Sequence, residues 1–459
     1  MNKLFFYLFI ALAFFSCRNR NPNLSEKQFQ SLFTEDKKAS EEKTTETLTM
    51  PEGYVPQAGV KYRQERDLSA PPVRIDIVKG IDHVRNMSLS QIAKDITYIN
   101  IGKHRFSVDV QVTPYGILVN NPDGVWLYAP DGQLIKEIYK NLCEYSPFGE
   151  DGTMVSSSDK FQGVEQVRYD EKNDRLWVKF REDNIRDHSR GFLGYIDMSQ
   201  LNVSNSEIKQ NLIIPLAEFG KGSMNYTEDF VIHQPYGKRL SHDFTTNTFF
   251  GDTLCCFTVG NDSITAKATR GVFIDNGNTY MYGGQFTFRK SFSDTLFRIT
   301  AANKLKPEYL LDAGTSGRAT NHCKITDVQI DRMYIIQSVK EDDRHLYVMF
   351  SKDYDCPANR SSQKVRFWWG IYDKTNREFF TLPIVSDSNP DEKGIENDLD
   401  GGLPFWPRKI GDRGEKYMNV MGKNMKNRLS EKSKTQHSEQ LKQFIQSLED
   451  DDRVIIIVK

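Results

Sequence analysis

The sequence predicts an all-β fold, a six-bladed β-propeller, and two observations carry this prediction. Runs of four to seven residues with alternating apolar side chains recur along most of the chain, and each run is closed by Gly, Asp or Asn. No helical period separates these runs, as it would in an alternating α/β protein. Repeated short hairpins of this kind form propeller blades, because each blade needs its neighbours to bury its two faces.

The hairpin over residues 294–314 shows the pattern most clearly. Residues 296–299 form its first strand, residues 303–307 its turn, and residues 309–311 its second strand, which ends at Asp312-Ala313-Gly314. Further strands and hairpins are expected, in chain order, at residues 73–77, 96–101, 116–119, 125–128, 134–138, 164–180, 193–196, 249–259, 271–288, 333–350 and 365–382. Six blades over residues 73–458 would average about 64 residues, above the roughly 40–50 of compact propeller repeats. Insertions such as residues 184–190 would explain the excess, and seven blades remain an alternative.

The C-terminal part of the chain predicts how the ring closes. One helix is expected over residues 427–448, with Leu441 and Phe444 on its apolar face. A strand follows at residues 454–458, and no later segment can pair with it. It must therefore pair backwards, and the strands within residues 73–101 are the partners that would close the ring without an exposed edge.

The N-terminal residues predict export and lipid anchoring. Residues 4–15 are all apolar, too few to span a hydrocarbon core of about 30 Å but typical of a secretory signal. Ser16 and Cys17 then resemble a loose bacterial lipobox, so residues 1–16 are expected to be a lipoprotein signal peptide and Cys17 to carry the lipid. The alternative is an ordinary secretory signal. Residues 17–72 are polar and are expected to form a flexible tether, with the propeller over residues 73–459.

Several motifs together resemble the six-bladed β-propeller lipoproteins of Bacteroides-type bacteria, a largely uncharacterised family. They are the lipobox at residues 14–17, residues 95–101, residues 294–299 with 307–312, residues 397–402 with 405–407, and residues 451–456. The resemblance implies this architecture and a location in the cell envelope, and it implies no catalytic residues. The glycine-rich segment that the family places before the second blade is looser here, at residues 143–158.

The chain shows no catalytic signature. The serine-hydrolase elbow, the phosphate-binding P-loop and the two-histidine zinc motif are all absent from the sequence. His233, His242 and His322 each have an aspartate nearby, and a structural or surface role is the favoured interpretation for each. Trp368 and Trp369 are adjacent in a strand and should face opposite sides, one in the core and the other as a candidate exposed platform for sugar or peptide.

A calcium site is one hypothesis for residues 396–402. Glu396, Asp398 and Asp400 occupy alternate positions before two glycines, and their oxygens could meet at one point, as a hard cation requires. The favoured alternative is that Asn397, Asp398 and Asp400 bond nearby backbone amides in a tight loop while Trp406 packs against a blade.

The sequence thus predicts a lipid-anchored envelope propeller, a non-catalytic module that binds a ligand or a protein of unknown specificity. Its alternatives are a propeller enzyme that acts on glycans, as a lyase or a hydrolase, and a structural component of an envelope assembly. The expected partners are the membrane, through the lipid at Cys17, and a protein or a glycan. The periplasmic side is favoured over the cell surface, because no acidic run follows Cys17. Nucleic acid is not expected, because 61 basic residues balance 62 acidic ones.

Overall fold

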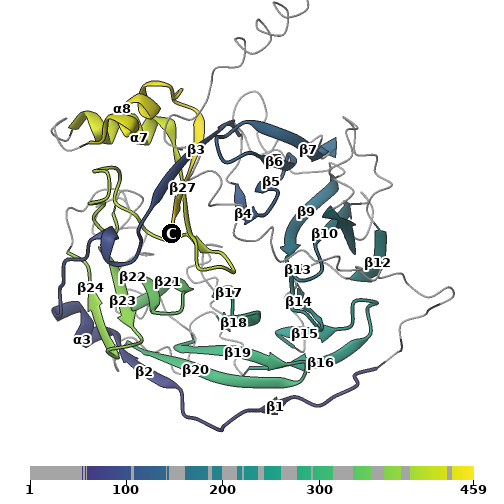
Figure 1. Ribbon diagram of the computed structural model, residues 1–459. Helices are drawn as coiled ribbons and strands as arrows, with labels where there is room; N and C mark the ends of the chain where they lie inside the picture. Colours follow the sequence, from purple (N-terminus) through teal and green to yellow (C-terminus); the bar gives the residue numbers. More distant parts are fainter. Residues whose placement is uncertain are drawn as a thin grey trace, which may run out of the picture.

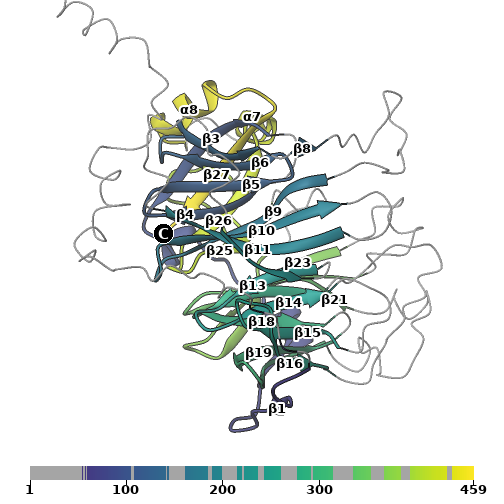
Figure 2. The same cartoon turned by 90° about the vertical axis from the view of Figure 1, so that its right-hand side faces the viewer.

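The computed structural model of the chain describes residues 54, 57, 59–104, 108–140, 142–143, 161–183, 189–198, 214–219, 222–235, 242–259, 277–290, 293–313, 334–352, 366–383, 393–431 and 437–459. Their strands form six sheets arranged as blades around one axis (Figure 1). The prediction of a six-bladed propeller is confirmed. Figure 2 shows the same ring from the side, with neighbouring blades next to one another around the axis.

Each blade is an antiparallel sheet, and five of the six follow the chain in order. The first blade contains β4 (Asp109–Thr113), β5 (Gly116–Asn121), β6 (Gly124–Tyr128) and β7 (Leu134–Lys140), and the second contains β8 (Leu142–Cys143), β9 (Phe161–Asp170), β10 (Arg175–Asp183), β11 (Ser189–Asp197) and β12 (Ile214–Phe219). The third contains β13 (Gly222–Tyr226), β14 (Val231–Pro235), β15 (Phe244–Asn247) and β16 (Thr253–Phe257), and the fourth contains β17 (Asn278–Tyr282), β18 (Gln285–Arg289), β19 (Thr295–Ala301) and β20 (Lys304–Asp312). The fifth contains β21 (Tyr334–Glu341), β22 (His345–Lys352), β23 (Arg366–Asp373) and β24 (Glu378–Thr381).

The sixth blade joins the two ends of the propeller. It is built from β25 (Lys409–Ile410), β26 (Lys416–Met421), β27 (Asp452–Val458) and β3 (Ile96–Lys103). The C-terminal strand β27 lies between β26 and β3, and Ile455 is paired with Asn419 on one side and with Ile99 on the other. The predicted pairing of the last strand with an early strand is confirmed. It leaves β27 no free edge, so the ring is closed by hydrogen bonds between residues from opposite ends of the fold.

Apolar side chains pack between the blades. The described residues form six buried clusters, and each cluster combines residues from two neighbouring blades. The cluster between the sixth and first blades, for example, contains Ile455 and Ile457 of β27 together with Val110 and Val119. Every sheet therefore buries both of its faces, which is why its strands contain consecutive buried residues, such as those of β5.

A polar cluster lies within the interface between the fifth and sixth blades. Asp342 is 3.1 Å from Lys416 Nζ, and it accepts hydrogen bonds from the Tyr347 hydroxyl and from the backbone of His345. Burial raises the pKa of Asp342, but its bonds to His345 and the charge of Lys416 outweigh burial and hold that pKa below its ordinary value. The Asp342 carboxylate is thus ionised, and Lys416 compensates its charge across the interface.

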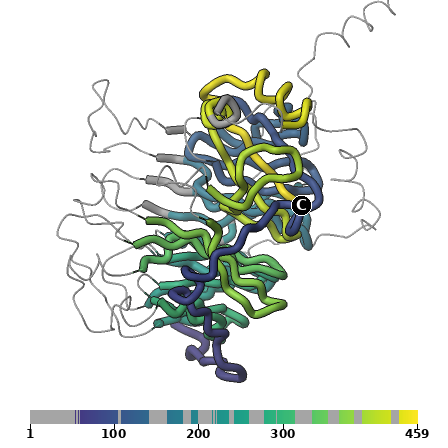
Figure 3. Tube along the Cα trace, turned by 90° about the vertical axis from the view of Figure 1, so that its left-hand side faces the viewer, coloured from purple at the N-terminus to yellow at the C-terminus, as the bar shows by residue number. Residues whose placement is uncertain are grey.

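The segment from residue 60 to residue 91, here called the strap, runs around the outside of the ring. Its backbone first bonds to β16, and β1 (Glu65–Arg66) and β2 (Val73–Asp76) then pair in parallel with β20. Helix α3 (Ile77–Asp82) packs on the fifth blade before the short 3-10 helix η2 (Leu89–Gln91). Figures 1 and 3 show the strap in purple along the outer edges of the green blades, on its way to β3. Residues 61–67, within the predicted tether, bond through their backbone to the third and fourth blades. The domain boundary at residue 73 stays a prediction.

Two local predictions are wrong. The helix expected over residues 427–448 is replaced by α7 (Gly422–Glu431) and α8 (Glu439–Gln446), because Ser438 is extended and its side chain caps α8 by accepting from the Leu441 amide. Trp368 and Trp369 do face opposite sides of β23, but both are buried. Trp368 stacks on Phe350 with 5.5 Å between ring centroids. Neither tryptophan offers an exposed platform.

Candidate functional site

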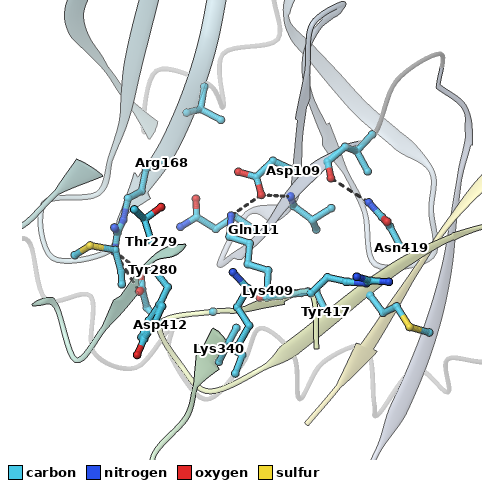
Figure 4. Close-up of a pocket in the computed structure, with 18 of the residues that line it drawn as sticks. Asp109, Gln111, Arg168, Thr279, Tyr280, Lys340, Lys409, Asp412, Tyr417 and Asn419 are labelled. Carbon is cyan, nitrogen blue, oxygen red and sulfur yellow. Dashed lines mark hydrogen bonds and ion pairs between the residues drawn. The ribbon is translucent and has the colours of Figure 1, made fainter. Parts of the chain in front are cut away.

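A cavity of about 360 Å³ lies on the axis of the ring. It is bordered by the innermost strand of every blade, β4, β9, β13, β17, β21 and β25, so no single blade makes the site. Figure 4 shows polar side chains from these strands around a shared space. Its polar lining includes Gln111, Gln166, Asn225, Thr279 and Asn419. A volume of this size suits one small ligand.

Two ion pairs cross the cavity wall between blades. Lys409 Nζ of β25 is 2.7 Å from Asp109 Oδ1 of β4, which joins the sixth blade to the first. Arg168 of β9 approaches both carboxylate oxygens of Asp412 at 3.2 Å. Both aspartates are therefore neutralised by a cation from another blade (Figure 4).

Glu341, at the end of β21, is the third carboxylate of the lining, and its side chain is fully buried. It is 2.6 Å from Arg298 and 2.8 Å from Lys374, and it accepts hydrogen bonds from the hydroxyls of Tyr280 and Tyr309 at 2.9 and 2.8 Å. Burial, followed by the Glu341 charge, raises the pKa of both tyrosines above the ordinary value. Four donors thus occupy the carboxylate oxygens, which makes Glu341 a structural anion between the fourth and fifth blades.

Lys340 precedes Glu341 on β21, and strand alternation directs the two side chains to opposite faces. The Lys340 side chain reaches the cavity near Lys409 (Figure 4). Within the part of the chain that the structure describes, no carboxylate forms an ion pair with Lys340. Burial, together with the positive charges of Lys409 and Arg408, outweighs the opposite effect of Asp109 and lowers the pKa of Lys340 to about 8. Among the described residues, Lys340 is therefore a lining cation that forms no ion pair with a carboxylate.

The carboxylates of the described lining are engaged by cations. A hydrolase or lyase that acts on glycans needs an acid and a base that can exchange protons with the substrate. The three carboxylates of the described lining, Asp109, Asp412 and Glu341, are each held in an ion pair. The amide, hydroxyl and ammonium groups around the cavity can instead donate and accept hydrogen bonds to a polar ligand.

The residues of the calcium hypothesis lie outside this cavity, and the carboxylates of Asp398 and Asp400 accept hydrogen bonds from separate partners. Asp398 accepts from the backbone and the hydroxyl of Ser90, at 2.9 and 2.6 Å. Asp400 accepts from the Tyr98 hydroxyl at 3.1 Å, and the Asn397 amide donates to it at 2.8 Å. Within the loop, Asn397 accepts from the backbone amides of Leu399 and Asp400, and Asp400 accepts from that of Gly402. Across the described ranges, no group of three or more His, Cys, Asp or Glu side chains is placed to hold a metal ion.

The remaining candidate residues are distributed around the molecule. Cys17 and His322 lie outside the described residues. His233 is buried, with its ring 5.7 Å from that of Phe219, and Trp406 is buried against Tyr347. None of these described side chains lines the cavity. The sequence did not indicate the lining residues, because Asp109 and Lys409 are 300 positions apart and meet only when the ring closes.

A family described as Domain of unknown function (DUF4933) matches residues 57–431. The chain belongs to this family. The DUF4933 match covers the strap and most of the ring, so the family of this chain is an uncharacterised one whose fold is a six-bladed propeller. No protein of curated function matches the chain.

Solved structures resemble the fold at low sequence identity. A Bacteroides fragilis protein described as exported is 10% identical with a TM-score of 0.52, and the match covers 85% of this chain and 99% of that one. A member of the DUF4221 family from Bacteroides vulgatus is 10% identical with a TM-score of 0.38, over 80% of this chain and 97% of that one. The soluble aldose sugar dehydrogenase of Escherichia coli is 8% identical with a TM-score of 0.36, over 80% of this chain and 99% of that one. Among the described residues, no helix is both long and apolar enough to cross a membrane.

Proposed function

We propose that this protein is a non-catalytic binding protein of the cell envelope whose axial cavity takes one small polar ligand. The observation that carries the proposal is the cavity itself, about 360 Å³ in volume and bordered by the inner strands of all six blades. Amide, hydroxyl and cationic side chains converge there from separate blades. A rigid ring holds them in place, which lowers the entropic cost of ordering a site when a ligand binds.

The state of the carboxylates supports binding in preference to glycan cleavage. Asp109, Asp412 and Glu341 would each have to break an ion pair before acting as an acid or a base. The energetic cost is greatest for Glu341, because removing one partner from a buried ion pair costs about 3–5 kcal/mol. The described lining therefore contains no carboxylate that is ready to protonate a glycosidic oxygen.

The location belongs to the same proposal. Residues 4–15 and the following Ser16-Cys17 support export and a lipid anchor at Cys17, on the periplasmic side of the membrane. The description of the similar Bacteroides fragilis protein as exported agrees with this location. The propeller would then be held near the membrane by acyl chains and by the polar segment that follows them.

A ligand screen on two variants tests the proposed site. The full chain is purified in detergent and offered to a glycan array and to a small-molecule extract of the envelope, with native mass spectrometry as the readout. Thr279 is exposed to the cavity, so Thr279→Trp should fill the space and abolish binding of any recovered ligand. Thr375→Trp, in an exposed turn of the fifth blade, is the matched control and should bind normally. A ligand that binds the Thr279→Trp variant as tightly as the parent would refute the cavity as the binding site.

The anchor has a separate test. Cys17→Ser should move the protein from the membrane fraction to the periplasmic fraction, or leave it unprocessed, because twelve apolar residues do not span a bilayer. Fractionation followed by immunoblotting measures this. If the processed Cys17→Ser variant still resists extraction from the membrane, then lipid at Cys17 is not the anchor.

A further inference from the structure

We infer that the ligand of the axial cavity carries an anionic group, a carboxylate or a phosphate, and that this group binds at the cationic end of the cavity, formed by Lys340, Arg408 and Lys409. This inference rests on the proposed function and adds the chemical class of the ligand. It also assigns Lys340 the role of the residue that contacts the anion.

The charges of the lining are unevenly compensated. Among the described residues of the lining, Arg168 is paired with Asp412 and Lys409 with Asp109, whereas Lys340 forms no ion pair. One carboxylate, Glu341, is already shared by Arg298 and Lys374, which lie outside the lining. The described carboxylates of the lining therefore leave the charge of Lys340 uncompensated.

The Lys340 side chain lies where the fifth and sixth blades meet. Lys340 at the end of β21 is close enough to Lys409 and Arg408 for their charges to destabilise its ammonium form. Asp109 opposes this effect, but its carboxylate is already engaged by Lys409 at 2.7 Å. Like charges that share a partly desolvated site are stabilised when an anion binds between them. An anionic ligand would supply the missing charge, and it would raise the pKa of Lys340 from about 8.

The neighbouring groups suit the rest of such a ligand. Thr279 and Asn225 lie on the inner strands of the fourth and third blades, and Gln111 lies on that of the first. These side chains can donate and accept hydrogen bonds without adding charge. A small polar molecule with one anionic group, such as a sugar acid or a sugar phosphate, is complementary to this combination of groups.

Protection of Lys340 from acetylation tests the inference on the parent protein. The full chain in detergent is treated with an acetylating reagent at pH 7.5 and constant ionic strength, and peptide mass spectrometry follows Lys340 alongside the exposed Lys140. Glucuronate, inorganic phosphate and glucose are the three probes, and glucose differs from glucuronate in lacking the carboxylate. We expect at least one of the two anions to slow the acetylation of Lys340 with an apparent affinity about tenfold higher than that of glucose, as one charge-assisted contact provides. Acetylation of Lys140 should not change.

The two anions distinguish a carboxylate site from a phosphate site, because only the preferred group should protect strongly. Calorimetry on Lys340→Met should show that the preference for the anion over glucose is lost, and Lys340→Arg should restore it. The inference is overturned if neither anion protects Lys340, or if glucose protects as well as the anions. If no anion protects but Thr279→Trp abolishes binding of a recovered ligand, the proposed function stands and the anionic class is wrong. If a recovered ligand ignores Thr279→Trp, the proposed function itself has failed.

Discussion

Truncating one side chain of the closing strand should weaken the whole ring. Ile455 is fully buried in β27, paired with residues on both neighbouring strands, and it packs in the cluster between the sixth and first blades. Ile455→Ala removes three carbon atoms from a core that cannot fully collapse around the space. Such a change in a packed core costs about 2–5 kcal/mol of unfolding free energy.

The exposed surface provides a matched control for this substitution. Ile135 lies on β7, the outer strand of the first blade, and 53% of its surface is exposed. Ile135→Ala deletes the same atoms and should change the unfolding free energy by less than about 0.5 kcal/mol. Deleting residues 454–459 is the severe version, because it removes five apolar side chains worth about 1.5–3 kcal/mol each. That sum is comparable to the total stability of a domain, about 5–15 kcal/mol, so cooperative folding should be lost.

Thermal unfolding followed by circular dichroism measures both substitutions. A folded unit of this size has an unfolding entropy of about 0.8 kcal/mol per kelvin, so Ile455→Ala should lower Tm by about 3–6 °C. Ile135→Ala should lower it by less than about 1 °C. Equal shifts for the two variants, or an unchanged Tm after the deletion, would refute the closure of the ring by β27.

Three other predictions concern the buried and loop carboxylates. Glu341→Gln should destabilise the protein by about 3–5 kcal/mol in urea unfolding, because it leaves buried cations without their anion; an unchanged midpoint would contradict the role of Glu341 as a structural anion. Asp342 has a lowered pKa in the folded state, so the stabilisation that its carboxylate provides is present at neutral pH and is lost as the pH falls below about 4. Asp342→Asn should therefore lower Tm at pH 7 and make the decline of Tm in acid shallower. Parallel curves of Tm against pH for the parent and the variant would contradict this prediction. The calcium hypothesis requires that millimolar calcium raises the Tm of the parent and that the double variant Asp398→Asn/Asp400→Asn abolishes this rise. The hydrogen bonds of these carboxylates predict instead that calcium does not raise the Tm of the parent. Calorimetry decides between the two expectations.

The closure of the ring could be predicted from the sequence because it depends on one short segment, residues 454–458. Residues 454–458 are an apolar strand, and in the structure this strand lies beside β26 and pairs, as expected, with the early strand β3. The sequence pattern does not indicate the division between α7 and α8, because the apolar spacing of Leu441 and Phe444 continues a helical pattern that begins earlier. Ser438 is a good capping residue, but it did not outweigh this pattern. Periodicity alone does not separate one long helix from two short ones.

The strap and the cavity could not be predicted in the same way. Residues 65–66 pair with β20 through backbone groups, which every sequence provides, so their polar side chains gave no signal. The cavity depends on which inner-strand side chains face the axis, and that depends on the register and rotation of all six blades. Lys340 and Glu341 are neighbours in the sequence and both border the cavity, yet four donors surround the Glu341 carboxylate and no described carboxylate forms an ion pair with Lys340.

A crystal structure of the protein with a ligand recovered from the screen would test the central claim most directly. The proposal predicts ligand density in the axial cavity, in contact with Lys340 and Thr279 and between the inner strands of several blades. Ligand density on the outer surface of the ring, with the cavity filled only by water, would contradict it.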